Sequence, residues 1–171
     1  MQYWNVTPEE IRAHYPCQDH AAPGDLLLLR AVDVDADPDT TFRWLCQLTV
    51  APYSYDWIDN GGRRSPATLT PGADRLVDGQ PVLSIFRLLE HDDRQLTMVT
   101  VPRAERLFGR VHATYLVTER PGGSRIVVAF TVGADGVTQR LRRRALAWGD
   151  VVMVRKQLLT LKEYAEASAG R

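Results

Sequence analysis

Lysine is scarce in this sequence, and neither sign of charge is in excess. Of the 21 basic residues only Lys156 and Lys162 are lysines, and 21 acidic residues bring the formal net charge to zero. A chain without surplus positive charge lacks the overall electrostatic attraction on which non-specific nucleic-acid binding depends. We therefore expect no nucleic-acid partner.

Cysteine and long apolar runs are also scarce. Cys17 and Cys46 are too few for a disulfide framework or a four-thiolate zinc site. The nearly apolar stretch Leu26 to Leu29 is far shorter than the roughly 20 residues of a membrane-spanning helix. The N-terminus carries charges where a secretory signal would place an apolar segment. These absences predict a cytoplasmic protein without stable membrane insertion, and they leave the oligomeric state open.

The remaining composition is that of an ordinary globular domain. The chain has 171 residues, of which 44% are hydrophobic and 25% charged. A chain of this length and composition can bury one sizeable core without a partner. We expect an N-terminal arm with a short helix over residues 1–24 and a single domain over residues 25–168.

Two cap-and-proline signals mark helix starts in the first fifty residues. Thr7-Pro8 is followed by Glu10 at the spacing of a capping box, and Asp37-Pro38 repeats the combination of a cap and a proline. We expect helices over residues 8–15 and 38–49. Between them, the composition of residues 26–34 is typical of a strand.

Four strand-like segments follow, over residues 81–90, 95–101, 110–119 and 125–132, and they predict an antiparallel meander. The tightest hairpin turns at residues 120–124. If Glu119 pairs with Arg125, then one face of this hairpin combines Ala113, Tyr115 and Val117 with Thr131, Ala129 and Val127. Neither face of the hairpin is strongly polar, so the sheet needs a covering element.

The C-terminal segment is expected to cover the sheet. Apolar residues recur there at spacings of 3, 4, 3 and 4, namely Val151, Val154, Leu158, Leu161 and Ala165. This is the stripe of a long amphipathic helix. The helix is expected to begin as early as Val137, with Gly149 as a point where it could kink.

Three segments carry a resemblance to a known superfamily. AVDVDADPDTTFRWL (31–45) resembles the first strand and following helix of the START-like (SRPBCC) superfamily, PGGSRIVVAF (121–130) its glycine-rich hairpin, and DVVMVRKQLLTLKEYAE (150–166) its closing helix. APYSYDWIDNGGRRSP (51–66) is similar to a block in bacterial members described as polyketide cyclase or lipid-transport-like proteins. The resemblance implies an α+β helix-grip fold, in which a curved antiparallel sheet wraps around a long C-terminal helix and encloses a hydrophobic cavity.

The block over residues 51–66 supplies the candidate residues for a cavity mouth. It combines amphipathic rings with carboxylates and an amide, the mixture that grips an apolar body and orients a polar group. An alternative is that the aromatic residues pin the loop to the core while the polar residues form a turn. Arg63 could pair with an acidic ligand group or form a surface ion pair. The candidates are Tyr53, Tyr55, Asp56, Trp57, Asp59, Asn60 and Arg63.

The candidates for the cavity wall come from the hairpin and the C-terminal helix: His112, Tyr115, Phe130, Val154 and Leu158. His112 and Tyr115 are the best acid–base candidates, because histidine titrates near neutral pH. They lie three residues apart on one strand and therefore point to opposite faces. Both cannot line one cavity, and the sequence leaves open which face does.

Other patterns favour no cofactor and no metal. His14, Cys17 and His20 are zinc-ligand types, but their spacing matches no zinc signature, and a solvated arm is the preferred interpretation. The arginines near residues 140–144 are interpreted as a solvated helix face. The sequence contains no nucleophile elbow, phosphate-binding loop or dinucleotide fingerprint.

The function predicted first is binding or transport of a small hydrophobic molecule, lipid-like or aromatic and polyketide-like, in the internal cavity. A second hypothesis is a polyketide cyclase or dehydratase in which the same cavity shapes the substrate and side chains move protons. A third is an interaction domain whose cavity has collapsed.

Overall fold

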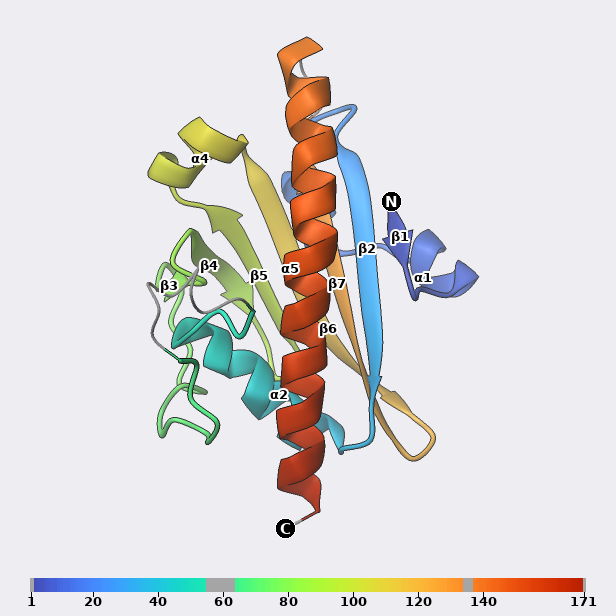
Figure 1. Ribbon diagram of the computed structural model, residues 1–171, viewed down its shortest axis with the longest axis vertical. Helices are drawn as coiled ribbons and strands as arrows, with labels where there is room; N and C mark the ends of the chain where they lie inside the picture. Colours follow the sequence, from blue (N-terminus) through green and yellow to red (C-terminus); the bar gives the residue numbers. More distant parts are fainter. Residues whose placement is uncertain (1, 55–63, 134–136, 171) are drawn as a thin grey trace.

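The fold is a curved seven-stranded sheet crossed by one long helix (Figure 1). The computed structural model describes residues 2–54, 64–133 and 137–170, with backbone only for residues 107–108 and 137–152. The strands are β1 (Tyr3–Trp4), β2 (Leu26–Val34), β3 (Pro81–Val82), β4 (Phe86–His91), β5 (Gln95–Thr100), β6 (Val111–Arg120) and β7 (Gly123–Val132). The helices are α1 (Pro8–Arg12), α2 (Pro38–Cys46), α4 (Pro102–Phe108) and α5 (Val137–Ala169), with short 3-10 helices η1 (Pro16–His20) and η2 (Gln47–Thr49).

The sheet has the order β1-β2-β7-β6-β5-β4-β3, and every pair except the parallel pair β1 and β2 is antiparallel. This confirms the predicted meander. The segment predicted as one strand over residues 81–90 is in fact two, β3 and β4, which pair with each other. Leu83 and Ser84 between them have positive φ angles of 53° and 61°, so the chain turns back at this point.

The predicted register of the β6–β7 hairpin is wrong by one residue. Glu119 pairs with Ser124, and Arg120 pairs with Gly123, so the turn has only two central residues. These are Pro121 and Gly122, and Gly122 has a φ of 79°, which fits the proline-glycine pattern of a type II turn. A shift of one residue exchanges the faces of one strand relative to the other. The residues that share a face with Tyr115 are therefore Val128 and its neighbours at alternate positions, not Ala129 and its neighbours.

Helix α5 packs along one face of the sheet and against α2. The predicted stripe is confirmed where side chains are described, because Val154, Leu158, Leu161 and Ala165 are all buried in the main hydrophobic core. The side chain of Val151 lies outside the described residues. Figure 1 shows α5 running lengthwise across the sheet, with α2 beside its C-terminal half.

The N-terminal residues cover part of the opposite face. Strand β1 extends the sheet beside β2, and the capping box of Thr7 and Glu10 starts α1 as predicted. Tyr15 and Cys17 are buried against β2 and β7 in a second, smaller apolar cluster. The expectation of a solvated arm is therefore wrong for these residues.

Several helix boundaries also differ from the predictions. Helix α1 ends at Arg12, not near residue 15, and the next residues form η1. The helix expected over residues 38–49 is α2 followed by η2, and the Asp37 side chain accepts from the backbone N–H of Thr40 at 2.8 Å. Helix α4 was not predicted, although Pro102 at its start and Gly109 at its end are ordinary boundary signals.

Candidate functional site

The candidate site is the interior between the sheet and α5. One face of the hairpin carries Ala113, Tyr115 and Val117 from β6 opposite Phe130, Val128 and Ile126 from β7. All six belong to the core beneath α5. Of the predicted wall residues, Tyr115, Phe130, Val154 and Leu158 are therefore brought together. Tyr115 and Phe130 pack edge to face with ring centroids 6.2 Å apart.

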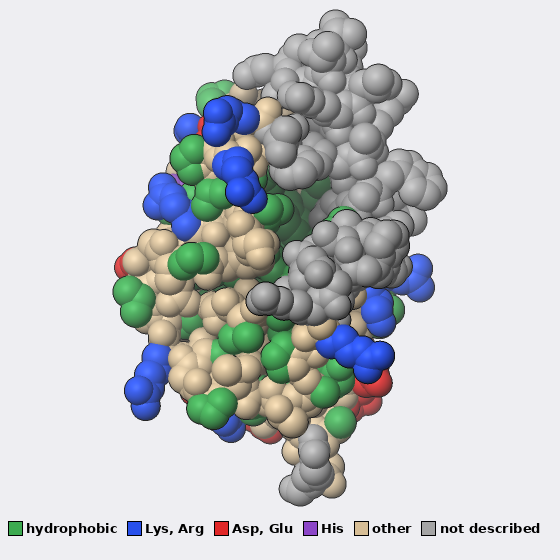
Figure 2. Space-filling view, turned by 60° about the vertical axis from the view of Figure 1, so that its left-hand side comes forward, with side chains coloured by type: hydrophobic (Ala, Val, Ile, Leu, Met, Phe, Trp, Pro, Cys, Tyr) green, Lys and Arg blue, Asp and Glu red, His purple; other side chains and the backbone are tan. Residues whose placement is uncertain are grey.

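Exposure within this interior rises toward one end. Five core residues toward the end of the sheet where α4 is found retain 6–9% of their surface: Val132, Phe130, Val111, Phe86 and Val154. Toward the opposite end, the exposure falls to 0–2% at Ile126, Val117, Leu161 and Ala165. On the α4 side Figure 2 shows a hollow whose visible floor consists of hydrophobic side chains.

The other end is closed by an aromatic cluster. Trp44 of α2, Tyr53 and Tyr164 of α5 lie with ring centroids 5.1–6.2 Å apart. The indole Nε1 of Trp44 donates to Ser168 Oγ at 2.9 Å. This cluster fastens the C-terminal half of α5 to α2. Because Tyr53 is 1% exposed and belongs to this cluster, its position fits the interpretation that it pins the loop to the core.

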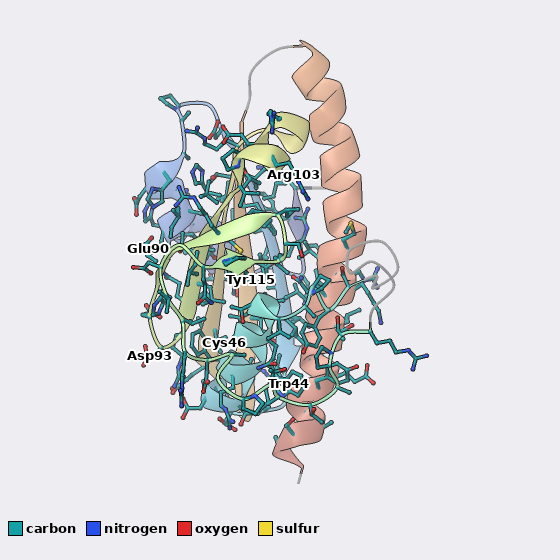
Figure 3. All side chains as sticks on the ribbon, turned by 90° about the vertical axis from the view of Figure 1, so that its left-hand side faces the viewer. Trp44, Cys46, Glu90, Asp93, Arg103 and Tyr115 are labelled. Atoms are coloured by element: carbon teal, nitrogen blue, oxygen red, sulfur yellow. The ribbon has the colours of Figure 1, made fainter. Side chains whose placement is uncertain are left out.

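Two linked hydrogen bonds cross the interior between these ends. The Tyr115 hydroxyl donates to Gln157 Oε1 at 2.7 Å, and Gln157 Nε2 donates to the Pro52 carbonyl at 2.6 Å. Gln157 is 4% exposed. Figure 3 places Tyr115 between Arg103 of α4 and Trp44 of α2 along the long axis. These hydrogen bonds therefore join the sheet, α5 and the start of the loop after η2 near the middle of the long axis.

Sequence reasoning missed Gln157. The available signal was a polar residue beside Leu158 on the otherwise apolar stripe of the C-terminal helix. Arg30 was also missed. It lies between Leu28 and Val32 at every second position of β2 and therefore shares with them the face beneath α5. Arg30 is fully buried, and its Nη1 donates to the carbonyl oxygens of Gln2 and Leu29. A buried guanidinium in an apolar wall is costly unless it is hydrogen-bonded, and these carbonyls meet part of that need.

His112 lies on the opposite face from Tyr115. Its ring stacks on His20 of η1 with centroids 5.6 Å apart, and it pairs across the hairpin with Thr131. His112 therefore does not line the interior beneath α5, which corrects its assignment to the cavity wall. Burial, with His20 and Arg110 nearby, lowers its pKa.

The predicted mouth residues from Tyr55 to Arg63 lie outside the described residues. This applies to Tyr55, Asp56, Trp57, Asp59, Asn60 and Arg63. The arginine side chains over residues 140–144 lie outside them as well.

The pattern of His14, Cys17 and His20 is not a ligand cluster in the structure. His14 bonds to Asp19 at 2.8 Å, whereas the backbone N–H of Cys17 donates to Thr114 Oγ1 at 2.9 Å. Within residues 2–54, 64–133 and 137–170, no group of three or more His, Cys, Asp or Glu side chains is arranged to hold a metal ion. No helix in this described part is both long and apolar enough to cross a membrane.

Solved structures share this architecture. The chain is similar to the di-domain ARO/CYC StfQ from the steffimycin biosynthetic pathway, with a TM-score of 0.55 and 14% identity over 86% of this chain and 52% of that chain. It thus spans about half the length of that protein. A protein from Rhodobacter sphaeroides matches with a TM-score of 0.52 and 13% identity over 82% of this chain and 93% of that one.

These comparisons agree with the sequence resemblance at the level of fold. No family model and no curated protein matches the sequence. The curved antiparallel sheet around a long C-terminal helix is the helix-grip fold. The predicted fold class is confirmed, whereas a fold of this kind does not determine the chemistry.

Proposed function

We propose that the protein binds a small, largely apolar molecule between the sheet and α5, with the opening at the end of the sheet near α4. The observation that carries this proposal is the distribution of residual exposure. On β6, β7 and α5, the inner side chains are sealed toward α2 but retain 6–9% of their surface near α4, at Val111, Phe130, Val132 and Val154. Residual exposure concentrated at one end is consistent with an entrance to an internal binding site.

The chemistry of the lining supports binding through apolar contact. The inner face of β6 and β7 is formed by aliphatic and aromatic residues, and each Å² of apolar surface buried contributes about 25 cal/mol. Small-molecule sites are commonly apolar with a few oriented polar groups. The hydrogen-bonded pair of Tyr115 and Gln157 is such a group.

Binding is favoured over the cyclase hypothesis because of the polar groups that the interior contains. Among the described residues, the buried charged or polar side chains include no carboxylate, and the only buried histidine, His112, lies on the other face. General acid–base catalysis needs such groups within hydrogen-bond reach of the substrate. The carboxylates among the candidate mouth residues, Asp56 and Asp59, lie outside the described residues.

The proposal is tested with the fluorescent apolar probe N-phenyl-1-naphthylamine. The wild type should enhance its emission with saturation, and the probe at a hundredfold excess over Kd should stabilise the fold by about 2.7 kcal/mol. Val154→Trp fills the open end and should abolish both effects. Leu159→Trp is the matched control, because Leu159 lies on α5 but is 40% exposed.

The proposal fails if the wild type shows no saturable signal. It also fails if Val154→Trp, folded by circular dichroism, binds the probe as well as Leu159→Trp does.

A further inference from the structure

We propose that Gln157 selects the ligand by donating a hydrogen bond from its side-chain amide to a carbonyl oxygen on an otherwise apolar molecule. This inference rests on the proposed function, because it requires a ligand between the sheet and α5. It adds the chemical group that the ligand must carry and the residue that recognises it.

The orientation of the Gln157 amide follows from its neighbours. The carbonyl of Pro52 can only accept a hydrogen bond, so the atom 2.6 Å from it must be the amide nitrogen. The amide oxygen then faces Tyr115, whose hydroxyl must donate across the 2.7 Å contact. Both ends of the amide are fixed by partners from different parts of the chain. A group held in this way pays little entropy when it binds a ligand.

One amide proton of Gln157 remains for a ligand. An amide NH₂ offers two donors, and in the described structure Gln157 Nε2 makes one hydrogen bond, to Pro52. Gln157 is 4% exposed, so this second N–H is nearly cut off from bulk water. A buried donor left without a partner loses its hydration without compensation. A ligand acceptor at this position would remove that cost.

The position of Gln157 suits contact with a ligand. It lies one helical turn from Val154, which retains 9% of its surface, and next to Leu158, which is fully buried. Figure 3 places its partner Tyr115 midway between α4 and Trp44. Gln157 is therefore at the inner limit of the open half, where a molecule entering from the α4 end would meet its first fixed polar group.

A carbonyl oxygen is the acceptor that fits this donor best. Gln157, Tyr115 and Pro52 bring no formal charge to the contact. A carboxylate would lose its hydration there without gaining a counter-charge from these three groups. The buried guanidinium of Arg30 on the same face already donates to the carbonyl oxygens of Gln2 and Leu29. A ketone, ester or quinone oxygen accepts the bond at a much smaller desolvation cost. The ligand class is therefore an apolar ring or chain that carries a carbonyl group.

The test compares 2-acetylnaphthalene with 2-ethylnaphthalene, which has a similar size but no carbonyl. Their Kd values are measured by displacement of N-phenyl-1-naphthylamine from the wild type and from Gln157→Leu. The preference for the ketone should fall about fivefold in Gln157→Leu, the effect of one net hydrogen bond. Gln95→Leu makes the same substitution on β5, on the face away from α5, and should leave the preference unchanged.

A spectroscopic readout separates recognition from general damage to the fold. The carbonyl stretch of bound 2-acetylnaphthalene should lie at lower frequency in the wild type than in Gln157→Leu, because a hydrogen bond weakens the C=O bond. Gln157→Met replaces Gln157→Leu if the latter does not fold.

The outcomes distinguish this inference from the proposed function. If both naphthalenes bind but the preference and the stretch are the same in the wild type and the Gln157 variants, this inference is wrong and the proposed function stands. If the probe binds but neither naphthalene displaces it, this inference alone is overturned. If the wild type does not bind the probe, both are overturned.

Discussion

His112 of β6 stacks on His20 of η1 with ring centroids 5.6 Å apart, on the face of the sheet opposite α5. The contact joins the N-terminal residues to the middle of the sheet. His112 is 6% exposed, and within the described residues its Nδ1 has no hydrogen-bond partner. His20 in turn lies 3.7 Å from a carboxylate oxygen of Glu90 on β4. Protonation of His112 would therefore place a positive charge in a buried position.

We expect stability to fall in acid through His112. Burial lowers its folded-state pKa below the usual 6.5, and His20 and Arg110 add to this effect, while Asp25 and Glu105 oppose it. A depressed pKa means that the folded state prefers neutral histidine. The stabilisation is complete above pH 6.5 and is lost as the pH falls from there through the folded-state pKa. Urea unfolding at pH 7.5 and pH 5.5 measures the loss.

His112→Gln is the variant that isolates this effect. It keeps a polar side chain on β6 but removes the titration, so its unfolding free energy should fall less between the two pH values than that of the wild type. His14→Gln is the control, because His14 is exposed and pairs only with Asp19 among the described residues. An equal acid sensitivity of His112→Gln and the wild type would exclude His112 as the source.

Both thiols should be unreactive toward thiol reagents in the folded protein. Burial raises the pKa of Cys17 to about 11 and that of Cys46 to about 12, so almost no thiolate exists at neutral pH. Since the thiolate is the reactive form, neither cysteine should react with a disulfide reagent before unfolding. Titration at pH 8 should find no reactive thiol in native protein and both in denaturant. Rapid reaction of either native thiol would contradict its placement.

Arg125 should be the strongest single anchor of the N-terminal residues. Its Nε donates to Glu10 at 2.6 Å and its Nη1 to Asp33 at 2.7 Å, and these hydrogen bonds, led by Glu10, raise its pKa. The side chains of Arg125 and Glu10 are only 14% and 16% exposed. Arg125→Gln leaves Glu10 without its cation and should lower the unfolding free energy by about 2 kcal/mol.

The control for this prediction is Arg12→Gln. Arg12 pairs with Glu9, and both side chains are more than 70% exposed, so the change should stay within about 0.5 kcal/mol. Arg125→Gln should also make Cys17 react faster than Cys46, because Cys17 is covered by the N-terminal residues that Arg125 holds. Equal losses of stability in the two variants would contradict the anchor.

The sequence predicted elements where local signals and periodicity agree. The spacing of Val154, Leu158, Leu161 and Ala165 identified the buried side of α5, and the apolar run over residues 26–34 gave β2 its observed bounds. These signals are local, so they do not depend on how distant parts of the chain meet.

The register of the hairpin and the site depended on distant contacts. Both faces of β6 and β7 are mostly apolar, so polarity could not decide the pairing, and a turn rich in proline and glycine permits more than one loop length. The chain from Tyr115 through Gln157 to Pro52 joins residues separated by 42 and 105 positions. Similarly, the burial of Cys17 depends on Ala129, which is 112 positions away.

The last prediction concerns the observed turn: replacing Gly123 by a residue with a side chain should destabilise the fold. A Cβ at this position would overlap the backbone carbonyl oxygen of Val34, the last residue of β2. Because the obstacle is backbone in a paired strand, it cannot rotate away as a flexible side chain would. Gly123→Ala should cost about 1–3 kcal/mol, the usual range for overpacking.

Gly122→Asn is the matched control, since Gly122 has a φ of 79° with open space around it and asparagine tolerates that conformation. Urea unfolding should rank Gly123→Ala well below Gly122→Asn. The reverse order would mean that the turn is centred elsewhere and that the faces of β6 and β7 are paired as the sequence first suggested.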